Sequence, residues 1–169
     1  MAQKITPFLW FDTSAEEAIN YYVKVFNEAP YSQKNCRVNF IQRYEKGIET
    51  PGAAEMEGKV LTAEFELDGQ KFQALDGGPI FKFNESISLL VDCRDQREVD
   101  YFWGKLSAVK ESEQCGWCKD RFGLSWQIIP QRLGELLRDP DKAKAHRVAN
   151  KMLQQHKVVI EELEEAYKG

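Results

Sequence analysis

The sequence has no long uninterrupted apolar stretch and no excess of basic charge, and each shortage removes a class of function. No apolar run approaches the roughly 20 residues that a membrane-spanning helix needs. The 169 residues carry a net charge of -4, with a pI of about 5.4. A general nucleic-acid binder normally shows a basic face instead. We therefore expect neither a membrane span nor nucleic-acid binding.

Export signals and glycine-rich cofactor loops are also missing. The N-terminal segment MAQKITPFLWFD lacks the apolar stretch and small-residue cleavage site of a signal peptide. This predicts a cytoplasmic location, in which the four cysteines remain free thiols. The sequence contains no GxGxxG turn, P-loop or GxSxG elbow, and both expected strand-to-helix turns lack glycine. We expect no bound cofactor.

The first half of the chain predicts the order strand, helix, strand, strand, strand. The apolar run 5–11 is typical of a buried strand, and Thr13 or Ser14 can cap the helix that follows, which ends near Asn27. The segment 37–45 reads as a strand with Val38 and Phe40 pointing inward, and the glycine-containing segment 47–58 as a loop. Strands at 60–67 and 70–75 are joined by the hairpin signal Asp68-Gly69.

The second half repeats this order of elements. A strand at 87–91 leads to a helix capped by Asp95, and short strands are predicted at 110–115, 117–121 and 124–129. After Pro130 the pattern becomes helical, with predicted helices at 133–137, 142–157 and 158–167.

Together these patterns predict an α+β fold of two βαβββ modules, whose curled mixed sheet surrounds a cleft, with helices at the C-terminus. We expect one domain over residues 1–169. Its parts are module one at about 1–78, module two at about 79–130 and a helical tail at about 131–169.

Several segments resemble the PhnB-like family, also described as 3-demethylubiquinone-9 3-methyltransferases, of the glyoxalase/bleomycin-resistance/dioxygenase (vicinal oxygen chelate) superfamily. They are ITPFLWFD with AEEAINYYVKVF, VLTAEFELDGQKFQALDGGPIFKFNESIS, CGWCKDRFGLSWQIIP and GELLRDPDKAKAHRVANKML. The resemblance implies a cleft between two modules and a homodimer. Since this superfamily hosts many activities, it does not assign a reaction.

Metal-using members of that superfamily place ligands at positions that correspond here to Ile5, the strand around Gln73, Ser86 and Gln127. Isoleucine cannot bind a metal, serine is a poor ligand, and neutral amides are weak ones. The only two histidines, His146 and His156, lie in the predicted tail, where we expect solvated side chains. We therefore expect no metal.

Two further features have both a structural and a functional interpretation. Cys115-Gly116-Trp117-Cys118 has the spacing of a zinc or redox motif, but it lies in a predicted strand region with no second pair of ligands, which favours chance spacing. Asp76, beside two glycines, is either an acid at the edge of the cleft or a turn-forming residue, and the second is commoner.

The leading hypothesis is a protein that binds an unidentified small molecule in the cleft, with or without catalysis. Strand parity from the family's ligand positions selects the candidate ligand-binding residues Pro7, Leu9, Gln73, Ser88, Leu90, Trp117 and Gln127. The amides and the serine would supply hydrogen bonds, and the others apolar contact. The alternatives are a metal-dependent lyase or dioxygenase, the methyltransferase of the family label, and a non-catalytic dimeric interaction protein.

Overall fold

Two mixed sheets, one of four strands and one of three, carry the α+β fold, with three helices at the C-terminal end. The computed structural model describes residues 3–48 and 55–169. The chain divides into two compact units, Met1–Phe83 and Asn84–Gly169. Within the described ranges, no helix is long and apolar enough to cross a membrane.

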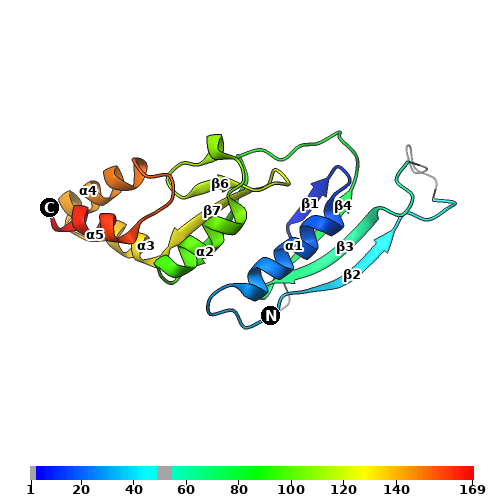
Figure 1. The fold of residues 1–169 in the computed structure, drawn as a ribbon, viewed down its shortest axis with the longest axis horizontal. Helices are drawn as coiled ribbons and strands as arrows, with labels where there is room; N and C mark the ends of the chain where they lie inside the picture. Colours follow the sequence, from blue (N-terminus) through cyan, green and yellow to red (C-terminus); the bar gives the residue numbers. More distant parts are fainter. Residues whose placement is uncertain (1–2, 49–54) are drawn as a thin grey trace. The chain divides into compact units, whose positions relative to one another are not determined.

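In its described residues, the first unit is one sheet with a single helix across it (Figure 1). Its strands stand in the order β1-β4-β3-β2, with β1 parallel to β4 and the other neighbours antiparallel. The turn between β3 and β4 has positive φ at both Asp68 and Gly69, which confirms the predicted hairpin. The elements are β1 (Phe8–Phe11), α1 (Ala15–Glu28), β2 (Arg37–Arg43), β3 (Val60–Leu67) and β4 (Gln70–Asp76).

A buried carboxylate, rather than a local side chain, holds the start of α1. Ser14 occupies the N-cap position but forms no side-chain cap bond. Instead Asp76 accepts a hydrogen bond of 2.8 Å from the backbone N–H of Ala15 and one of 3.0 Å from that of Val60. One aspartate at the end of β4 thereby ties the first turn of α1 to the start of β3. The turn-forming role predicted for Asp76 is replaced by this cross-linking role.

Strand β2 departs from simple alternation, so the prediction that Phe40 points inward is wrong. A register irregularity lies between Val38 and Phe40, and it places Phe40 opposite Glu64. The Phe40 side chain is 53% exposed as a result. A bulge adds one residue to one strand, and every side chain beyond it changes face.

The second unit contains a three-stranded sheet in the order β5-β7-β6, with β5 parallel to β7 and β6 antiparallel to it. The elements are β5 (Leu89–Cys93), α2 (Gln96–Leu106), β6 (Trp117–Lys119) and β7 (Ser125–Pro130). The N-cap predicted at Asp95 is confirmed, because its side chain accepts a hydrogen bond of 3.0 Å from the N–H of Glu98.

The strand predicted at 110–115 is wrong, and the second module is one strand shorter than the first. Lys110–Ser112 forms a 3-10 helix, closed by backbone hydrogen bonds from Ser112 to Val109 and from Glu113 to Lys110. Ser107 Oγ also donates to the Glu113 carboxylate over 2.6 Å. These local bonds satisfy backbone groups that a strand would have paired with a neighbour, and only Gln114 retains a bridge to Trp117.

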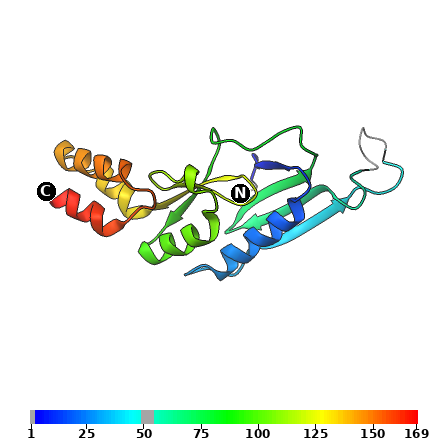
Figure 2. The same cartoon turned by 45° about the horizontal axis from the view of Figure 1, so that its top comes forward.

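The predicted helical tail is confirmed (Figure 2), and its buried residues form a core of their own. Its helices are α3 (Gln131–Leu137), α4 (Lys142–Leu153) and α5 (Ile160–Lys168). Polar contacts join their ends, including hydrogen bonds from Arg147 to the carbonyls of Ala166 and Tyr167. The buried core is formed by Leu133, Leu136, Val148, Val158 and Leu163.

We predict that Asp76→Ala lowers the free energy of unfolding by about 2–4 kcal/mol, because two buried N–H groups lose a charged acceptor. Urea denaturation followed by circular dichroism measures this change. Asp12→Ala, at an exposed aspartate nearby in the fold, is the matched control and should shift stability by less than about 0.5 kcal/mol. Equal effects of the two substitutions would contradict the cross-linking role.

Candidate functional site

The register of the first sheet separates the predicted site residues of this unit onto two faces. Asp76 points toward α1, so Ala74, two residues earlier on β4, points the same way. Leu9 pairs with Ala74 and is buried, whereas Gln73 pairs with Phe8 on the opposite face. Pro7 shares the parity of Leu9. The side chain of Gln73 therefore shares a face with Phe8 and not with Leu9, although its backbone N–H donates to the Pro7 carbonyl over 2.9 Å. The part of these residues in ligand binding stays a prediction.

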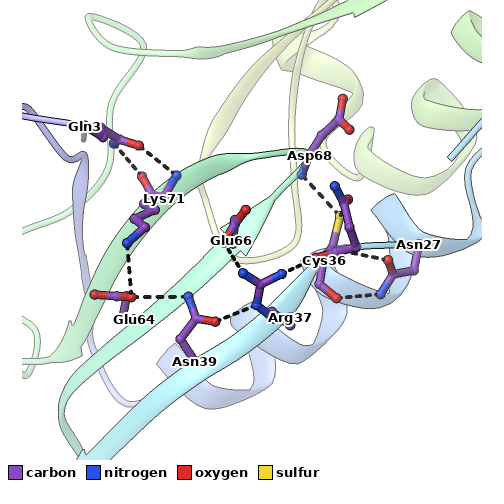
Figure 3. Close-up of polar contacts among 10 residues, drawn as sticks. Gln3, Asn27, Cys36, Arg37, Asn39, Glu64, Glu66, Asp68 and Lys71 are labelled. Carbon is purple, nitrogen blue, oxygen red and sulfur yellow. Dashed lines mark hydrogen bonds and ion pairs between the residues drawn. The ribbon is translucent and has the colours of Figure 1, made fainter. Parts of the chain in front are cut away.

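The face of this sheet opposite α1 carries a chain of polar contacts across three strands (Figure 3). Arg37 pairs with Glu66 over 2.8 Å and also donates to the amide oxygen of Asn39. Asn39 in turn donates to Glu64, whose carboxylate lies 3.9 Å from the ammonium of Lys71. The charged side chains on this face therefore already pair with one another.

In the second sheet, three predicted site residues form one row across the strands. Leu90 on β5 pairs with Gln127 on β7, and Gln127 pairs with Trp117 on β6. Directly paired positions on neighbouring strands hold their Cβ atoms about 4.5–5.5 Å apart on the same face. This places an amide between an exposed leucine and a half-buried tryptophan.

A second, more polar row lies beside the first. Ser125 pairs with Lys119, two residues along from Gln127 and Trp117 respectively. Ser88 precedes β5 and accepts a hydrogen bond of 2.8 Å from the Gln127 side chain. We call the set the outer face of the second sheet. Its members are Ser88, Leu90, Trp117, Lys119, Ser125 and Gln127.

Sequence reasoning found four of these six residues and missed Lys119 and Ser125. Ser125 follows from parity, because it lies two residues before Gln127 in the same strand. Placing Lys119 on this face requires knowledge of the register between β6 and β7, which the sequence alone does not give. The outer face lies away from α2, because the opposite face carries the buried residues Val91, Cys118 and Ile128.

Two polar groups of the outer face have unusual environments. Ser125 is 1% exposed, and its Oγ has no hydrogen-bond partner among the described residues. The Lys119 ammonium forms an ion pair with Glu85, whose side chain is 58% exposed, whereas that of Lys119 is 21% exposed. This hydrogen bond from Lys119 lowers the pKa of the Glu85 carboxyl below its ordinary value.

The tight turn before β6 positions Trp117. Cys115 and Gly116 both have positive φ, and the N–H of Trp117 donates to the carbonyl of Gln114 over 2.7 Å. The tail holds this turn, because the N–H groups of Cys115 and Gly116 each donate over 2.7 Å to the carbonyls of Gln155 and His156. The CxxC spacing thus belongs to a hairpin turn and not to a helix N-terminus, where a reactive thiol would be expected.

The donor set does not fit the metal that the superfamily resemblance implies. Among residues 3–48 and 55–169, no three His, Cys, Asp or Glu side chains lie close enough to hold a metal ion. Ile5 is exposed and apolar, and Gln127 already donates to Ser88. Neutral amides and a single hydroxyl bind divalent cations weakly without charged companions.

Residues 3–129 match the sequence model of a family described as 3-demethylubiquinone-9 3-methyltransferase. This match spans most of the chain, and the chain belongs to that family, the PhnB-like proteins. The helices α3, α4 and α5 lie beyond the matched residues. The predicted family is therefore confirmed, whereas the family description by itself assigns no reaction to this chain.

The chain is 32% identical to a putative 3-demethylubiquinone-9 3-methyltransferase, PhnB protein, from Bacillus cereus, with a TM-score of 0.59. That similarity covers 76% of this chain and 99% of the Bacillus protein. Protein PA1353 from Pseudomonas aeruginosa shares the fold at 16% identity and a TM-score of 0.56, over 76% of this chain and 98% of that one. Among curated proteins, none matches.

We predict that the native thiols react slowly with Ellman's reagent at pH 7.5. Burial raises the pKa of the Cys93 and Cys118 thiols to about 12 and also raises the pKa of Cys36 and Cys115. A raised pKa leaves less of the reactive thiolate at neutral pH. In denaturant all four should react quickly. Rapid reaction of Cys118 in the folded protein would contradict the structural reading of the CxxC.

We also predict that Gly116→Ala destabilises the protein by about 2–4 kcal/mol, since alanine disfavours positive φ and its Cβ would crowd the tail. An added Cβ would lie 2.6 Å from Ile129 Cδ1 and 3.2 Å from Val158 Cγ2. Gly104→Ala, at an exposed position in α2 where nothing lies within 4 Å of the new Cβ, is the control. It should stabilise by about 0.5–1 kcal/mol, as measured by urea denaturation.

Proposed function

We propose that this protein binds an organic small molecule on the outer face of its second sheet. The observation that carries the proposal is the row of Leu90, Gln127 and Trp117, which sets one orienting amide between two apolar side chains on a face that α2 leaves uncovered. Small-molecule sites combine apolar contact area with a few placed polar groups, and this row has that composition.

The polar half of the outer face supports the same proposal. Ser88 and Gln127 are already joined by a hydrogen bond, which orients the amide and leaves its carbonyl oxygen to accept from a ligand. The proposal is one of binding, and it assigns no reaction to the site. The part of Gln73, on the first sheet, stays a prediction from the family resemblance.

Two alternative activities have weaker support from the side chains present. Metal-dependent lyase or dioxygenase chemistry needs a set of donors, and the described part of the chain clusters none. The methyl transfer of the family description commonly uses a glycine-rich turn between strand and helix, and neither Asp12–Ser14 nor Arg94–Asp95 contains glycine. Dimerisation and a cytoplasmic location stay predictions, and sedimentation equilibrium tests the first.

The test is a fragment screen of aromatic compounds by ligand-observed NMR, with hits confirmed by titration calorimetry. We predict that Gln127→Leu weakens binding of the hits about five- to tenfold, because a ligand hydrogen bond is lost. The same substitution should leave stability unchanged or raise it, since leucine extends the apolar contact between Leu90 and Trp117.

Gln154→Leu, at an exposed glutamine at the C-terminal end of α4, is the matched control and should leave binding unchanged. The proposal is wrong if no fragment binds at millimolar concentration, or if Gln127→Leu and Gln154→Leu bind the hits equally well.

A further inference from the structure

Lys119 gives the outer face of the second sheet a charge that its other residues lack. Of the six residues that define this face, the others are neutral: two serines, a leucine, a tryptophan and a glutamine. The side chain of Lys119 is only 21% exposed, so much of it is shielded from water. A partly desolvated cation attracts an anion more strongly than a fully hydrated one does.

The Lys119 ammonium already forms an ion pair with a carboxylate of the protein. Glu85 lies three residues before Ser88 in a turn outside the regular strands, and its side chain is 58% exposed. The nearby Asp120 does not compete for Lys119, because its carboxylate is directed to the other face. There it accepts hydrogen bonds from the N–H groups of Phe122 and Leu124 and from Trp126 Nε1.

Ser125 supports an anion-binding site at Lys119 independently, because its side chain lacks a hydrogen-bond partner in the part of the chain that the structure describes. It pairs directly with Lys119 across β6 and β7, so both side chains point to the same face. Its buried Oγ has no hydrogen-bond partner among the described residues, and an unpaired buried hydroxyl is costly. A carboxylate on Lys119 can accept a hydrogen bond from this hydroxyl with its second oxygen.

The spacing of the two rows sets the size of the ligand. Trp117 and Lys119 are two residues apart on β6, as Gln127 and Ser125 are on β7, and such pairs are about 6.5–7 Å apart along a strand. A molecule with a carboxylate over Lys119 and Ser125 would therefore place an attached ring over Gln127, between Leu90 and Trp117. A bicyclic aromatic acid spans this distance.

Building on the proposed binding function, we infer that the ligand is an aromatic or similarly apolar carboxylic acid whose carboxylate displaces Glu85 from Lys119. Glu85 acts as an internal competitor, which holds the cation while the site is free. Binding exchanges one carboxylate for another and requires no covalent step. Lys119 is then the residue that selects acids over their neutral analogues.

The test compares naphthalene-2-carboxylate with naphthalene-2-carboxamide, two probes of nearly equal shape, by titration calorimetry on the full chain. The wild type should bind the acid more tightly than the amide, and added NaCl should weaken only the acid. Glu85→Gln removes the competitor and should tighten acid binding about two- to fivefold, with no change for the amide. Lys119→Met should abolish the preference for the acid.

The outcomes separate the two proposals. This inference is overturned if the wild type binds acid and amide equally well and Glu85→Gln changes neither affinity. In that case, weaker binding of both probes by Gln127→Leu would still support the proposed function. If neither probe binds at millimolar concentration, this inference fails, whereas the proposed function fails only if no fragment of the aromatic screen binds. Glu85 is exposed, so Glu85→Gln should fold normally and decides the matter even if Lys119→Met does not fold, which circular dichroism would show.

Discussion

Successive side chains of a β-strand point to opposite faces of the sheet. In both sheets of this protein, a helix already covers one of the two faces. Helix α1 covers the side of Ala74 and Asp76 in the first sheet, and α2 leaves the side of Gln127 uncovered in the second. Each strand can therefore offer a ligand only every second residue. This constraint decides which side chains of the two sheets can act together, and it explains why Leu9 and Gln73 do not.

Buried aspartates fix the positions of the elements that frame these faces. Asp76 ties α1 to two strands of the first sheet, and Asp120 gathers two backbone N–H groups and the Trp126 indole in the second. In each case a single carboxylate satisfies several donors that would otherwise be buried without partners. Asp76 and Asp120 are thus part of the framework of their sheets.

Membership of the PhnB-like family and the chemistry of the site are separate matters in this chain. The family match ends at residue 129, but the turn that carries Trp117 is held by Gln155 and His156 from the helices beyond it. The tail therefore acts on the candidate site even though it lies outside the matched residues.

The sequence by itself determined the order of most elements, because alternation, capping residues and turn signals are local properties. The hairpin at Asp68-Gly69, the N-cap at Asp95 and the helical tail followed from it, as did the family through its motifs. Only the tertiary structure decided the bulge that exposes Phe40, the 3-10 helix at Lys110–Ser112 and the pairing of Lys119 with Ser125. These features depend on register and on contacts between residues distant in sequence, and a one-residue shift in register reverses the face of every side chain that follows.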